Sequence, residues 1–279
     1  MAKPCPRIQC FQEPGDRVVV TRDGRPVLNY HFGADYPRPF IYPLLTPQGH
    51  NVLACGHSVD LVGHSHHRGI FAGHMDVNGQ KFWADKDNRC VHQRLLKLDS
   101  GVDEGTVASF NHWMAGNAPL LDETREFTVR ADGSLLVKLE IAAHNAEVAL
   151  GVTKFGFLAC RVAKTIGVAA GDGRITDATG RINEKAIYGQ RAAWCDYSGP
   201  VAAGKEGGPD VWAGITIHDD PANPRHPTPW MCRDDGWFSP GFNMIEPFTL
   251  KKGGKLTLRY RIIAHDGARP AATPPAPAR

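Results

Sequence analysis

The sequence has no apolar run of eighteen residues, so it contains no candidate transmembrane helix. It has no basic run either. Its 32 Lys and Arg against 29 Asp and Glu give a net charge of +3, spread along the chain, which speaks against nucleic acid as a partner. The first seventeen residues lack the apolar segment of a secretory signal. We therefore expect a cytoplasmic protein with neither membrane nor nucleic-acid partners.

Familiar local signatures are also missing. The seven cysteines are scattered, odd in number and without a C-x-x-C pair, which indicates reduced thiols in the cytoplasm. There is no P-loop, no dinucleotide fingerprint, no G-x-S-x-G elbow and no internal repeat. Short motifs of these kinds therefore assign neither a cofactor nor a reaction.

Turn-forming residues are abundant, with thirty glycines and twenty-one prolines, and alternation of period two recurs along the chain. This pattern predicts an all-β protein, a two-sheet antiparallel β-sandwich. We expect an N-terminal extension over residues 1–16, one domain over residues 17–267 and a disordered Pro/Ala-rich tail over residues 268–279. The stretch 162–190 reads as a long loop region with one short helix.

Two hairpins and a closing strand are the clearest expected elements. The closing strand covers residues 255–265, with one set of side chains facing inward: Leu256, Leu258, Tyr260, Ile262 and Ala264. Residues 17–21 and 26–32 flank Asp23-Gly24, and residues 121–130 and 134–144 flank Asp132-Gly133, which are turns of the favoured Asp-Gly type. In the second hairpin, Glu123 and Arg125 share the apolar face with Leu121. Charges there need partners, so they form either a structural ion pair or the polar lining of a pocket.

A histidine cluster at residues 57–83 is the most unusual stretch. If it is extended from residue 64, alternation places one set of side chains on one face: His64, His66, Arg68, Ile70, Ala72 and His74. His67 points the other way with Phe71 and Met75. Three interpretations remain open: hydrogen bonds to loop backbone, a metal site, or a metal-free site in which histidine moves protons and arginine holds an oxyanion or hydroxyl. We favour the third, because no carboxylate or cysteine follows at a diagnostic metal-ligand spacing.

Several segments together resemble one family. They are Thr46-Pro-Gln-Gly49, His64-Ser-His-His-Arg-Gly69, Val77-Asn-Gly-Gln-Lys-Phe-Trp83, Glu123-Thr-Arg125, Lys154-Phe-Gly156 with Arg161, 194–199, 223–233 and 253–267. They look like the PmoA family, "methane oxygenase PmoA", over roughly residues 17–267, although members usually carry Asp where Lys81 stands. The resemblance implies a sandwich of the galactose-mutarotase type associated with sugar-oxidoreductase systems. The membrane-spanning monooxygenase of that name is a different kind of protein, because this chain has no segment able to cross a bilayer.

Our prediction is a carbohydrate-active enzyme that performs acid/base chemistry on a sugar or keto-sugar, as a lyase, hydrolase or epimerase. The expected catalytic residues are His66, His67, Glu123 and Lys154. The expected substrate-binding residues are Arg68, Arg125, Arg161, His226, Trp230 and Arg233. The expected partner is a small-molecule carbohydrate, and the oligomeric state is left open.

Two alternatives belong to other classes. One is a non-catalytic carbohydrate-binding or scaffold module, which would not need His67 and Glu123 within hydrogen-bond reach of one cavity. The other is a metalloenzyme of the oxygenase type, with a divalent metal held by His64 and His66. We predict no cofactor and no metal, because His66 and His74 would lie roughly 26 Å apart on a straight strand, too far for one ion.

Overall fold

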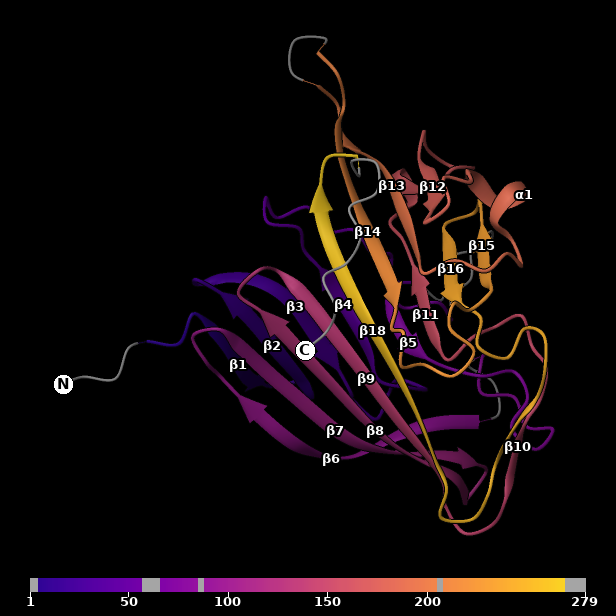
Figure 1. Ribbon diagram of the computed structural model, residues 1–279. Helices are drawn as coiled ribbons and strands as arrows, with labels where there is room; N and C mark the ends of the chain where they lie inside the picture. The colour runs from indigo at the N-terminus through magenta and orange to yellow at the C-terminus, as the bar shows by residue number, and fades with distance from the viewer. Residues whose placement is uncertain (1–4, 57–65, 85–87, 205–207, 269–279) are drawn as a thin grey trace.

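Strands dominate the computed structural model, which describes residues 5–56, 66–84, 88–204 and 208–268 (Figure 1). These residues form eighteen strands, a 3-10 turn, η1 (Lys164–Ile166), and a short helix, α1 (Asn183–Ile187), beside β12 and β15. The predicted all-β class is confirmed. None of the described helical segments is long and apolar enough to span a membrane.

The first sheet has eight antiparallel strands and joins distant parts of the chain. From edge to edge it contains β1 (Ile8–Glu13), β2 (Arg17–Arg22), β3 (Arg25–His31), β4 (Phe40–Leu44), β5 (Ile70–Ala72), β11 (Leu158–Arg161), β16 (Trp237–Pro240) and β15 (Trp230–Arg233). Strands from the first quarter of the chain thus pair with strands from its second half.

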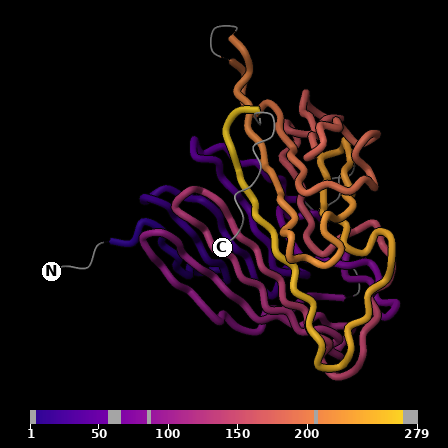
Figure 2. Tube along the Cα trace, in the orientation of Figure 1, coloured from indigo at the N-terminus to yellow at the C-terminus, as the bar shows by residue number. Residues whose placement is uncertain are grey.

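The second sheet also has eight antiparallel strands. In order it contains β12 (Arg174–Asp177), β13 (Trp194–Ala202), β14 (Val211–Asp219), β18 (Lys255–Asp266), β9 (Ser134–Ala143), β8 (Ala118–Arg130), β7 (Glu104–Ala115) and β6 (Asn88–Asp99). A separate two-stranded ribbon pairs β10 (Val148–Leu150) with β17 (Phe248–Leu250). In Figure 2 the chain around β10 (pink) and the chain around β17 (yellow) run side by side.

One hydrophobic core lies between the sheets, and alternation decides which side chains enter it. On β18 the predicted inward set is buried: Leu256, Leu258, Tyr260, Ile262 and Ala264. Both expected hairpins form, β2 with β3 and β8 with β9. The predicted two-sheet antiparallel sandwich is therefore confirmed.

The strand inventory departs from the sequence analysis in three places. Residues 8–13, assigned to an N-terminal extension, form β1, which pairs with β2 and buries Ile8 completely. The region 162–190 holds the expected short helix, α1, and also a strand, β12. Of the histidine-rich stretch only Ile70–Ala72 is a strand, and residues 57–65 lie outside the described part of the chain, as do residues 269–279 of the predicted tail.

Candidate functional site

A second group of buried apolar side chains covers the outer face of the first sheet, away from the main core. On β5, Ile70 and Ala72 point into the core while Phe71 points outward, and the neighbouring strands alternate in the same way. We call this group the outer cluster: Phe40, Phe71, Trp83, Ala159, Met231 and Trp237. Since these side chains are buried, other groups cover them on the outer side of the sheet, and the polar groups among these are the first place to look for a site.

Two arginines flank Trp237 in the sheet. Arg161 on β11 and Arg233 on β15 are both direct cross-strand partners of Trp237 on β16. Directly opposed residues lie close together on one face, so the three side chains form a row on the outer face with Trp237 in the middle. Each arginine has a carboxylate partner. Arg161 Nη1 lies 3.2 Å from Asp235 Oδ1, and Arg233 Nε lies 2.8 Å from Glu184 Oε1.

His66 and His67 of the histidine cluster lie next to this row together with Arg68. The His67 ring stacks on Trp237, with 4.2 Å between ring centroids and 30° between planes. The His66 ring is 4.2 Å from the His67 ring, in an edge-on orientation. The Arg68 guanidinium lies 5.9 Å from the centre of the Tyr36 ring, which packs against the outer cluster. His67 is almost fully buried, whereas His66 and Arg68 are partly exposed.

Arg68 was expected to share a face with Ile70 and Ala72, and this is wrong. Gly69 adopts φ +52°, which interrupts the extended alternation between Arg68 and Ile70. Arg68 therefore reaches Tyr36 beside the outer cluster, while Ile70 and Ala72 enter the core. The prediction that His67 faces the same way as Phe71 and Met75 is confirmed, because all three contact the outer cluster.

Lys154 lies at the border of this face. Its Nζ is 5.5 Å from the centre of the Phe155 ring, and Phe155 packs on Trp83 with 4.5 Å between ring centroids. The lysine itself is exposed. The predicted residues His66, His67, Arg68, Arg161, Arg233 and Lys154 are thus gathered around the outer cluster.

Glu123 and Arg125 lie in the other direction, between the two sheets. The Glu123 carboxylate is fully buried, pairs with the Arg125 guanidinium and accepts a 2.6 Å hydrogen bond from Trp113 Nε1. Arg125 Nη1 donates to the Pro39 carbonyl at 2.8 Å. Among the described residues the bonding partners of Glu123 are Arg125, Trp113, Asn111 and Cys90, and do not include His67. Of the two interpretations, the structural ion pair is what the geometry shows.

Two further expected binding residues also lie elsewhere. Trp230 is fully buried in the main core, and its indole N–H donates to the Ala192 carbonyl at 2.8 Å, so its ring offers no surface to a ligand. His226 pairs with the buried Asp219 carboxylate at 2.8 Å on the loop after β14. Burial raises the pKa of Asp219, and its hydrogen bonds from Asn223, Thr228 and His226 oppose that shift.

The metal-ligand alternative at the histidine cluster falls partly outside the described residues. His64 lies outside these residues, so the His64–His66 alternative stays untested. His74 is fully buried against Phe157, at 5.0 Å between ring centroids, and its Nδ1 accepts a 3.0 Å hydrogen bond from the Asp76 backbone N–H. Burial lowers the pKa of His74 to about 4, partly opposed by Asn243 and Asp76.

Three residues of the site were missed from the sequence: Trp237, Asp235 and Glu184. One local signal was present, since Asp235-Gly236 is a turn of the favoured hairpin type between two short apolar runs. It would have paired Trp230–Arg233 with Trp237–Pro240 and set Trp237 beside Arg233. Glu184 had no comparable signal, because it reaches Arg233 from α1, almost fifty residues earlier.

A family model described as a family of unknown function, DUF6807, matches residues 17–275. The chain belongs to this family. No curated protein matches it significantly. The DUF6807 match leaves the resemblance to the PmoA family a prediction.

Solved structures similar to this DUF6807 chain are distant in sequence. Heparan sulfate lyase HepC from Pedobacter heparinus is 10% identical with a TM-score of 0.41, and covers 91% of this chain. Galactose 1-epimerase from Lactobacillus acidophilus is 7% identical with a TM-score of 0.42, and covers 94% of this chain and 98% of its own. The chain spans only 34% of the length of the lyase.

Proposed function

We propose that the chain is a carbohydrate-active enzyme that moves a proton on a sugar or keto-sugar bound over the outer cluster. The observation that carries the proposal is the cross-strand row Arg161–Trp237–Arg233, with His67 stacked on the indole. Guanidinium groups bind hydroxyl, carboxylate or enolate oxygens through paired donors, and imidazole transfers protons near neutral pH. A row of this kind combines both capacities on one face.

In this proposal the roles follow from exposure. His66 is the proton-transfer group, because it is more exposed than His67, which orients it by ring contact. Arg68, Arg161 and Arg233 bind the ligand. Asp235, whose side chain is 41% exposed and pairs with Arg161, takes the carboxylate role that the sequence analysis assigned to Glu123. The aromatic rings of the outer cluster are themselves buried and support these groups from beneath.

A carbohydrate-binding module without turnover is the second candidate. One observation favours it: His67 and Glu123 form no acid/base pair, since the carboxylate is held by Arg125 and Trp113 between the sheets. The same arginine row would serve binding alone. The two candidates therefore share a ligand class and differ only in chemistry.

Proton NMR in D₂O with a panel of neutral and acidic sugars and keto-sugars tests both. We expect ligand binding together with deuterium incorporation or a new product. His66→Gln should slow the reaction by roughly 100-fold or more with binding retained. Arg233→Ala should weaken binding, whereas Arg174→Ala on the exposed edge strand β12 serves as the matched control. Binding without turnover would favour the module, and absence of binding would contradict both.

A further inference from the structure

Three metal-ligand side chains meet on the outer face of the second sheet. His112 on β7 and Asp122 on β8 are direct cross-strand partners, so their side chains share one face at close range. His144 follows β9, and its backbone N–H donates to the Leu120 carbonyl at 3.0 Å, which holds it beside Asp122. The set could not be identified from sequence spacing, because its members come from two strands and from the residue that follows a third.

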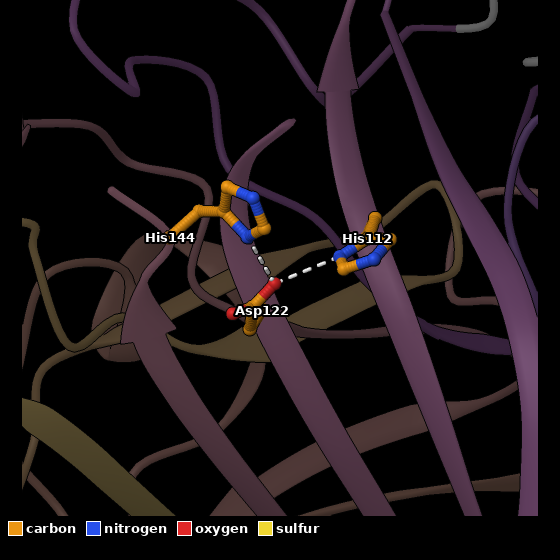
Figure 3. A group of neighbouring side chains, drawn as sticks. All are labelled: His112, Asp122 and His144. Carbon is orange, nitrogen blue, oxygen red and sulfur yellow. Dashed lines mark hydrogen bonds and ion pairs between the residues drawn. The ribbon is translucent and has the colours of Figure 1, made fainter. Parts of the chain in front are cut away.

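Both imidazoles turn toward one carboxylate oxygen (Figure 3). The Asp122 Oδ1 atom lies 2.7 Å from His112 Nδ1 and 2.8 Å from His144 Nδ1. The two rings stand edge to face, with 5.2 Å between centroids. One ligand atom from each residue lies within 4.8 Å of the others, and each side chain keeps between 22% and 27% of its surface exposed. An ion from solvent can therefore reach all three.

We propose that His112, Asp122 and His144 form a binding site for a divalent first-row metal ion of the zinc class. Two neutral imidazoles and a carboxylate are ligands that zinc, iron and copper accept. Ligand atoms around a tetrahedral zinc ion stand roughly 3.3 Å apart. Asp122 Oδ1 would withdraw from each ring nitrogen by about half an ångström, and the two histidine ligand atoms, which lie within 4.8 Å of each other, would settle at the same spacing. Three protein ligands leave a coordination position open.

The same surface holds a depression of about 410 Å³, whose lining includes His112 of the triad. The other lining groups include Arg89 and Asn117. A depression of this volume accepts a small molecule, and Arg89 favours an anionic one. The structure thus joins a metal-type triad to a place for the metal's exogenous ligand, on the sheet opposite the outer cluster.

Zinc titration of the full chain, purified with a chelator that is then removed, tests the site by calorimetry. The wild type should bind about one equivalent. Asp122→Asn and the double variant His112→Gln, His144→Gln should bind at least tenfold more weakly, because even indirect partners of metal ligands contribute roughly 10–100-fold. Asp122→Asn keeps the shape of the side chain, and a thermal melt checks that the variant is folded.

Two further histidine variants make the assignment specific. His50→Gln, in the turn after β4, should leave zinc binding unchanged. His66→Gln should also leave it unchanged, and a loss of binding there would move the metal to the histidine motif and overturn the proposal. Absence of stoichiometric binding by the wild type, or equal binding by the Asp122→Asn variant, would overturn it as well.

Discussion

Glu123 and Arg125 show how one pair of charges is accommodated inside a β-sandwich. Both side chains are almost without solvent contact, and Trp113, Asn111 and the Pro39 carbonyl supply further hydrogen bonds. A buried ion is tolerated only when its partners are in place, and removal of one partner leaves the other charge uncompensated. Replacing either residue should therefore lower the stability of the fold.

We predict that Arg125→Met lowers the free energy of unfolding by about 3–5 kcal/mol. The matched control is Lys255→Met, which removes the exposed ion pair with Glu140 on the same sheet and should cost at most about 1 kcal/mol. Urea denaturation measures both. Similar losses for the two variants would show that the buried pair has no special weight. A fully stable but inactive Glu123→Gln variant would restore a catalytic role for Glu123.

His74 links stability to pH. Its pKa falls from 6.5 to about 4 in the folded protein, so the unfolded chain binds the extra proton first as the pH drops. Its contribution to stability is complete above pH 6.5 and is lost as the pH falls toward 4. The loss amounts to about 3 kcal/mol. Denaturation at several pH values should show a flatter dependence in His74→Gln, and an identical dependence would contradict this.

At the scale of elements, the segment before β5 decides where the histidine motif lies. The Gly69 N–H donates to the Ala54 carbonyl at 2.8 Å, and the Gly69 carbonyl accepts from the Arg161 N–H at 3.0 Å. Its left-handed φ allows both bonds while Arg68 turns toward Tyr36. The glycine thereby ties the histidine motif to β11, which carries Arg161.

We predict that Gly69→Ala is much more destabilising than Gly24→Ala. Both glycines have positive φ, so both variants incur about 1–2 kcal/mol of backbone strain. A Cβ at Gly69 would lie 2.0 Å from the Ile41 carbonyl oxygen, whereas Gly24 has nothing within 4 Å. The steric conflict adds about 1–3 kcal/mol. Thermal or urea unfolding compares them, and equal losses would mean that the backbone relaxes freely around Gly69.

At the scale of the whole molecule, β1 is part of the sandwich. Ile8 is completely buried, and its side chain lies over Gly105 on β7. This edge strand of the first sheet therefore packs against the second sheet. Phe11 on the same strand is 39% exposed. Side chains of one short strand therefore contribute very differently to the common core.

We predict that Ile8→Ala lowers the free energy of unfolding by about 2–5 kcal/mol, as expected for a large-to-small change in a packed core. Phe11→Ala should change it by at most about 0.5 kcal/mol, since it removes a surface side chain. Chemical denaturation of both variants is the measurement. A negligible effect of Ile8→Ala would mean that β1 adds little to the stability of the sandwich, as expected of an N-terminal extension.

The class of fold and several elements follow from local patterning alone. Alternation is a property of neighbouring residues, so it identified the hairpins at Asp23-Gly24 and Asp132-Gly133 and the inward face of β18. It also placed Glu123 and Arg125 on a buried face. It did not reveal their partners Trp113 and Asn111, because these lie on β7, and the register between β7 and β8 cannot be read from alternation along one strand.

Local patterning does not specify which strands lie together. The backbone hydrogen bonds of one strand fit any other, so alternation does not specify that β5, β11 and β16 become neighbours or that Trp237 lies between Arg161 and Arg233. The same holds for His112, Asp122 and His144, which meet through the register of three strands. Side-chain clusters made across a sheet depend on register and sheet order, and these are settled by packing of the whole molecule.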